Sequence, residues 1–138
     1  MVNLNRMRFL IGYEQRLRFD RLKKFARATK ITTILTGMPR GSSTGNQTQD
    51  GAIELAMVDE AYREVWQELQ TMRDELEALL SSLDNPDDRG VMRLRYIDGW
   101  RLRDIPDAVH LSERAMYYHL ASAERKLARM YPESVIVR

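Results

Sequence analysis

The sequence has no cysteine, and this absence excludes disulfide bonds and thiolate metal sites. Histidine is scarce as well: only His110 and His119 occur, we expect His119 at the surface, and we predict neither a metal site nor a cofactor. No apolar run approaches the roughly 20 residues that span a bilayer. Residues 1–5 lead into a basic segment instead of the apolar stretch of a secretory signal. We therefore expect a cytoplasmic protein without a membrane partner.

The sequence also lacks the residue patterns of common enzymes. It shows no Ser/His/Asp set, no glycine-rich phosphate loop and no group of metal ligands. Carboxylates are numerous, but in a chain with 30% charged residues their number alone indicates no catalysis. We therefore predict a binding protein and not an enzyme.

Charge is distributed unevenly along the 138 residues, although the net charge is only +2. Residues 1–40 hold ten Lys and Arg against two Asp and Glu, residues 50–88 hold two against twelve, and residues 89–138 hold ten against six. The three segments therefore carry +8, −10 and +4. Basic ends are typical of a polyanion partner such as DNA. The first basic segment has an alternative, because it can instead pair with the acidic middle segment.

The chain is predicted to be all-α, because no stretch alternates apolar and polar residues for long and β-branched residues are not clustered. Residues 37–51 are rich in Gly, Ser and Asn, and we expect a flexible loop there. Residues 1–36 before it are predicted to form a basic helix with loosely spaced apolar positions at Leu10, Tyr13, Leu17 and Phe25.

Residues 52–83 are predicted to form a long acidic helix with a regular apolar stripe. The stripe must be buried, either against the first helix in an antiparallel hairpin or against a second copy in a homo-oligomer formed through residues 55–83. A helix stop and restart follows at residues 84–86, so we place a domain boundary at residue 84. The stripe has the alternating spacings of three and four of a heptad repeat, at Leu55, Val58, Tyr62, Val65, Leu69, Met72, Leu76, Leu79 and Leu83.

Residues 84–138 have the layout of a helix-turn-helix, in which two short helices are joined by a few residues. A further short helix is predicted to precede this pair. The three helices are expected over residues 86–97, 102–109 and 113–130, with the tight turn at residues 110–112.

Three residues around this turn decide its geometry. Ser112 is a suitable N-cap for the last helix. Pro106 disfavours helical geometry at the preceding residue, so we expect the second helix to start late or to be kinked. His110 lies in this turn, where a left-handed backbone conformation would be uncommon but tolerable for histidine.

The last helix presents a basic and aromatic face opposite to its apolar face. Along this face, arginines that can pair with guanine in the major groove alternate with aromatic and small side chains. The start of the helix can hold a phosphate, and the preceding helix begins with two arginines that can meet the DNA backbone. The candidate DNA-binding residues are Arg101, Arg103, Ser112, Glu113, Arg114, Tyr117, Tyr118, Ala121 and Arg125.

Several stretches of residues 94–127 resemble region 4 of sigma-70 family factors: residues 94–100, 104–105, 111–117 and 123–127. The whole chain is also similar to the RinA/ArpU-type late transcription regulators of phages and prophages. Those proteins have a basic first helix, a loop similar to residues 38–42, a long middle helix and a sigma-like helix-turn-helix. The resemblance implies a sequence-specific regulator that binds double-stranded DNA in a bacterial host cell and activates late or packaging genes.

Two other functions fit the same sequence. A small-terminase-like protein would use a helix-turn-helix and oligomerising helices to mark DNA for packaging. A sigma-like adaptor would bind RNA polymerase instead of DNA. A large ring of subunits would favour packaging, whereas a monomer, dimer or tetramer would favour regulation.

Overall fold

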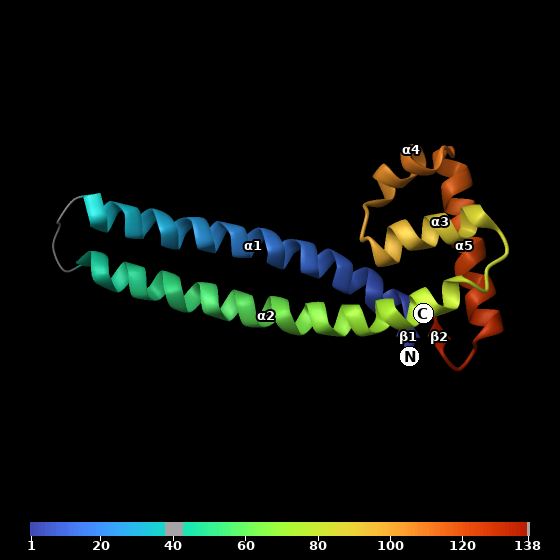
Figure 1. Cartoon of the computed structure of the whole chain (residues 1–138), viewed down its shortest axis with the longest axis horizontal. Coiled ribbons are helices and arrows are strands. Elements are labelled where there is room, and N and C mark those ends of the chain that lie inside the picture. Colours follow the sequence, from blue (N-terminus) through green and yellow to red (C-terminus); the bar gives the residue numbers. More distant parts are fainter. Residues whose placement is uncertain (38–42, 138) are drawn as a thin grey trace. The chain divides into compact units, whose positions relative to one another are not determined.

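The computed structural model of the chain describes residues 1–37 and 43–137, with side chains described up to residue 27 and from residue 51. These residues are mostly helical (Figure 1), which confirms the predicted all-α fold. None of the described helices is long and apolar enough to cross a membrane. The chain divides into two compact units. Unit 1 consists of Met1–Ile11 and Glu68–Arg138, and unit 2 of Gly12–Gln67.

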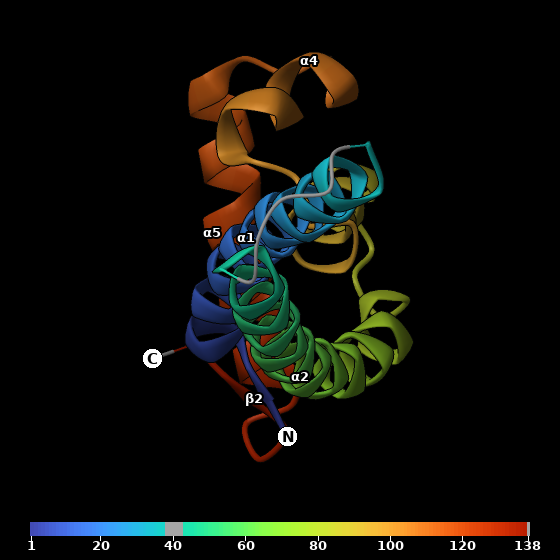
Figure 2. The same ribbon diagram turned by 90° about the vertical axis from the view of Figure 1, so that its left-hand side faces the viewer.

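Unit 2 is an antiparallel pair of helices (Figure 1, Figure 2). Its two halves belong to α1(Leu4–Gly37) and α2(Ser43–Leu80). The basic helix pairs with the acidic one in this unit, as the hairpin prediction requires. The contacts between the helices include Lys24 Nζ to Glu54 Oε2 at 2.9 Å, Tyr62 Oη to Glu14 Oε1 at 3.1 Å, and the ion pair of Arg21 with Asp59.

In these contacts, basic side chains that could have bound DNA pair with carboxylates of the acidic helix instead. The hydrogen bond and charge of Lys24 lower the pKa of Glu54 from its ordinary value. Arg27 also lies 3.5 Å from the same carboxylate. In the described part of unit 2, pairing within the hairpin is therefore the supported role of the basic helix.

One prediction for this region was wrong. The loop was expected over residues 37–51, but α2 already begins at Ser43, while residues 38–42 lie outside the described residues. A lone glycine costs a helix only about 1 kcal/mol, so Gly45 and Gly51 weaken α2 without ending it. The side chain of Phe25, one of the loosely spaced apolar positions of α1, is 58% exposed.

The heptad stripe of α2 is buried along most of its length. Burial is only partial at its N-terminal end and at Leu79, and α2 ends at Leu80 instead of residue 83. The prediction that the stripe packs is therefore confirmed within a single chain. The fully or nearly buried members are Val65, Leu69, Met72, Leu76 and Leu83.

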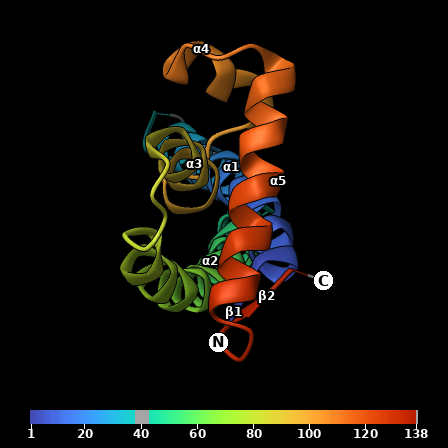
Figure 3. The same ribbon diagram turned by 90° about the vertical axis from the view of Figure 1, so that its right-hand side faces the viewer.

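Unit 1 has apolar residues of the N-terminal segment in its core. The short strand β1(Val2–Asn3) pairs in parallel with β2(Val135–Ile136), which follows the last helix (Figure 3). The predicted domain of residues 84–138 is therefore incomplete. Unit 1 adds to it the apolar side chains of the N-terminal segment and of the end of α2. The buried N-terminal side chains are Val2, Leu4, Met7, Leu10 and Ile11.

The remaining elements of unit 1 follow the predicted order of short helices. Asn85 caps the first of them by accepting a hydrogen bond from the Asp87 N–H at 2.8 Å. Gly99 has a φ of +70° at the bend before the second, which suits glycine. The elements are α3(Pro86–Met92), a π-helical turn η1(Arg93–Ile97), a 3₁₀ turn η2(Leu102–Asp104), α4(Ile105–Val109) and α5(Glu113–Met130).

The turn between α4 and α5 has the expected geometry. Helix α4 starts late, after η2, and Pro106 lies in its first turn, where a missing N–H costs no helical hydrogen bond. His110 ends α4 in the left-handed region, with φ 57° and ψ 41°. The prediction that the second helix starts late is confirmed. Helix α4 has only five residues, and Pro106 near its start does not interrupt it.

We expect His110→Gly to stabilise the protein by about 1 kcal/mol, because the left-handed conformation strains any residue with a Cβ atom. His110 is exposed, so little packing is lost. Urea unfolding of the full chain measures the effect. His110→Ala is the matched control and should not stabilise, since alanine keeps the Cβ atom; equal gains for both variants would contradict the strain at this residue.

Candidate nucleic-acid interface

Helix α5 is built by local signals and by one apolar stripe. The Ser112 hydroxyl accepts a hydrogen bond from the Ala115 N–H at 3.1 Å, so the predicted N-cap is confirmed. Helices α3 and α4 both pack against α5 (Figure 3). The side chains of the apolar stripe, Met116, Leu120, Ala123 and Leu127, are buried.

All nine candidate DNA-binding residues are exposed to solvent. The two tyrosines could have packed in the core, but the Tyr117 and Tyr118 side chains are 45% and 65% exposed. The structure therefore brings a basic and aromatic surface together on α5 and on the segment that leads into α4. Its binding of DNA stays a prediction. The exposed residues are Arg101, Arg103, Ser112, Glu113, Arg114, Tyr117, Tyr118, Ala121 and Arg125.

A shallow groove of about 330 Å³ lies where α4 and α5 begin. A guanidinium and the capping hydroxyl both line it, and groups of these two kinds contact phosphates in protein–DNA complexes. Two carboxylates also line it, so the groove is not purely basic. Its lining residues are Arg103, Pro106, Asp107, Leu111, Ser112 and Glu113.

Two exposed residues extend the predicted surface. Arg129 follows Arg125 by four residues on α5 and is exposed, so the basic face continues for one more turn. Trp100 lies directly before Arg101 and is 39% exposed. Both could have been found in the sequence, Arg129 from its spacing and Trp100 from its place in the sigma-like stretch of residues 94–100.

The buried polar residues behind α5 were not predicted. The hydroxyl of Tyr96 donates to Glu124 Oε1 at 2.5 Å, and both side chains are buried. Burial and then the Glu124 carboxylate raise the pKa of Tyr96 above its ordinary value, so it stays a neutral donor. The surface position expected for His119 was wrong: its side chain is only 17% exposed and is bonded to the fully buried Asp88.

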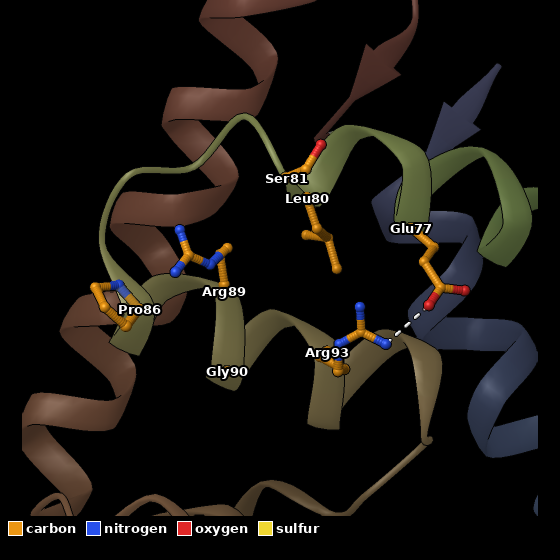
Figure 4. Close-up of a pocket in the computed structure, with 7 residues that line it drawn as sticks. All are labelled: Glu77, Leu80, Ser81, Pro86, Arg89, Gly90 and Arg93. Atoms are coloured by element: carbon orange, nitrogen blue, oxygen red, sulfur yellow. Dashed lines mark hydrogen bonds and ion pairs between the residues drawn. The ribbon is translucent and has the colours of Figure 1, made fainter.

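A second hollow, of about 500 Å³, lies between the end of α2 and α3 (Figure 4). It contains two guanidinium groups, but both have protein partners. Arg93 Nη1 bonds Glu77 Oε1 at 2.8 Å, and Arg89 Nη1 donates to the Leu83 carbonyl. Since both guanidinium groups already have protein partners, this hollow is a weak candidate for an anion site.

Among the residues that the structure describes, no group of three or more His, Cys, Asp or Glu side chains could hold a metal ion. No curated protein and no solved structure matches the chain. A family described as "Protein of unknown function (DUF1492)" matches residues 34–128, which is more than half of the 138 residues. The match spans α2 and the helices up to the last turn of α5. The chain therefore belongs to the DUF1492 family.

Proposed function

We propose that the protein is a sequence-specific DNA-binding transcription regulator, and that α4 and α5 act as its helix-turn-helix. One observation carries the proposal. Helix α5 is held by its apolar stripe and by buried polar contacts, while its opposite face exposes Arg114, Tyr118 and Arg125. An exposed helix of this composition, preceded by a short helix and a three-residue turn, has the form that enters the major groove in helix-turn-helix proteins.

The proposed roles divide between base and backbone contacts. Arg114, in the first turn of α5, reads a guanine, because the N-terminal residues of a recognition helix contact base edges. Tyr118 and Ala121 contact thymine methyl groups or sugar. Arg101 and Arg103 contact phosphates beside the groove.

The resemblance to RinA/ArpU-type regulators supports a narrower proposal. The regulated promoters are those of phage or prophage late genes, and the protein activates them. Enzymatic activity has no part in this proposal. Recovery of the DNA fragments that the protein binds in the source genome tests both the binding and the location of the sites.

We expect Arg114→Ala to weaken binding to the selected duplex by ~1–3 kcal/mol and to weaken binding to random duplex much less. The physical reason is that a base contact is lost only on the correct sequence. Selection from a random duplex library gives the cognate sequence, and fluorescence anisotropy at one fixed salt concentration measures both affinities.

Arg93→Ala is the matched control, because it removes the same charge from an exposed side chain outside α4 and α5. It should leave the preference for the cognate duplex intact. Equal losses on both duplexes for Arg114→Ala would make Arg114 a phosphate contact. If the selection enriches no sequence, the proposed function is wrong.

A further inference from the structure

Asp88 is a fully buried carboxylate in the first turn of α3 that holds α5 at two points. Its Oδ1 lies 2.7 Å from Nδ1 of His119, and its Oδ2 accepts a hydrogen bond from Nζ of Lys126 at 2.8 Å. Since an ionised carboxylate only accepts, Nδ1 of His119 carries the proton of this hydrogen bond. The two donors come from α5 and the acceptor from α3.

The spacing of the two donors fixes α5 in two directions. His119 and Lys126 are seven residues apart, which is about two helical turns, so both lie on one edge of α5. Each oxygen of Asp88 therefore bonds a different turn. Hydrogen bonds are directional, so α5 can neither rotate about its axis nor slide along it without losing one of the two.

A second buried contact holds the other edge of α5. Glu124 accepts the hydrogen bond of Tyr96, and it lies about 140° around the helix from His119 at 3.6 residues per turn. The apolar stripe runs between these two edges. Apolar contact is non-directional and by itself tolerates a small rotation. The polar contacts at the two edges remove that freedom.

A gain in stability does not by itself explain why the carboxylate of Asp88 is buried. Burying a carboxylate costs free energy that its partners only partly return, and apolar residues in such places are often as stable. Rotation matters for base readout, because with a helix radius of about 5 Å a turn of about 30° moves the side-chain ends by about 3 Å. That displacement equals the length of a hydrogen bond, so Arg114 would miss its base while phosphate contacts could adapt.

We propose that Asp88 is a positioning residue that sets the rotation of α5 through His119 and Lys126 and thereby gives the protein its sequence preference. The proposal rests on the proposed DNA-binding function. Tyr96 and Glu124 set the same rotation from the opposite edge. Asp88 itself lies in the core and contacts no DNA.

The test compares Asp88→Asn with Asp87→Asn in the full chain. The first variant places an amide N–H against one of the two donors, so one contact is lost. The second removes the same charge from the same helical turn, but its side chain is half exposed and its Oδ2 lies 3.9 Å from Nε2 of His119, which is beyond hydrogen-bond distance. We expect Asp88→Asn to lose about 10-fold or more of the preference for cognate over random duplex, as one lost base contact would. The affinity of Asp88→Asn for random duplex should stay close to the wild-type value. Asp87→Asn should keep both the wild-type affinity and the wild-type preference.

A second pair of variants covers the case in which Asp88→Asn does not fold. His119→Asn keeps an N–H donor near the place of Nδ1 and should retain the preference. His119→Leu removes the donor and should lose the preference while keeping affinity for random duplex. The proposal would be overturned if both variants retained the preference for the cognate duplex, or if both lost it.

A distance measurement without DNA separates the positioning role from the proposed function. The chain has no cysteine, so spin labels can be attached at Asp84→Cys and Arg129→Cys alone. We expect Asp88→Asn to shift or broaden the distance distribution between them, and Asp87→Asn to leave it unchanged. An unchanged distribution in Asp88→Asn overturns the positioning role. If the wild-type protein binds no duplex, the DNA-binding function is wrong, and this distance still decides whether Asp88 orients α5.

Discussion

Deletion of Met1–Ile11 will unfold the unit that carries α5, although these residues are distant from it in sequence. The segment contributes five apolar side chains that are no more than 2% exposed, and β1 pairs with β2 directly after α5. Burial of each such side chain stabilises by about 1.5–3 kcal/mol, so the loss is on the order of 10 kcal/mol. That loss is similar to the whole stability of an ordinary domain, about 5–15 kcal/mol.

Thermal unfolding followed by circular dichroism, together with dispersion of the α5 amide resonances, measures this effect. The same argument predicts that a fragment of residues 84–138 has no cooperative transition of its own. Point variants supply the control: Met7→Ala should cost about 2–5 kcal/mol, whereas Asn5→Ala at an exposed position should cost little. A truncated chain that melts as the full chain does would show that the N-terminal segment is not part of this core.

Leu76→Asp will destabilise unit 1 by at least about 4 kcal/mol, because a carboxylate would enter a fully buried apolar site without a partner. Ala78→Asp is the matched control on the same helix. Ala78 is exposed, so this variant should lose only the difference in helix propensity, about 0.7 kcal/mol.

Urea unfolding and sedimentation together distinguish the two ways in which the heptad stripe could be buried. Burial within one chain predicts that Leu76→Asp lowers the free energy of unfolding at every protein concentration. If unfolding stays unchanged while the sedimentation coefficient falls, the stripe at Leu76 is an interface between copies of the chain.

The region around the turn from α4 to α5 was predicted well because its signals are local. A serine N-cap needs only the backbone amide three residues later, and a proline restricts only itself and the residue before it. The apolar periodicity of α5 likewise determines its buried face before any partner is known. For these reasons Ser112, Pro106 and the exposed face with Arg114 were found from the sequence.

The composition of unit 1 was not predicted, because it depends on contacts between residues that are far apart. β1 and β2 have two residues each, too few for any alternating pattern to indicate a strand. The expected domain boundary at residue 84 followed from a helix stop, which marks the end of an element and not the end of a core. Only the packed chain shows that Met7 and Leu76 lie in one core.

The all-α class, the acidic helix with its apolar stripe, and the basic face of α5 could be predicted from local sequence patterns, since helix periodicity and capping depend on neighbours within a turn or two. Which charged side chains stay available for a partner depends on the packing of the folded chain. In unit 2, Arg21 and Arg27 of α1 pair with carboxylates of α2. Asp88, one acid among many in the sequence, becomes the buried acceptor of His119 and Lys126. Whether a charged side chain faces water or a partner depends on the approach of distant segments, which no local pattern encodes.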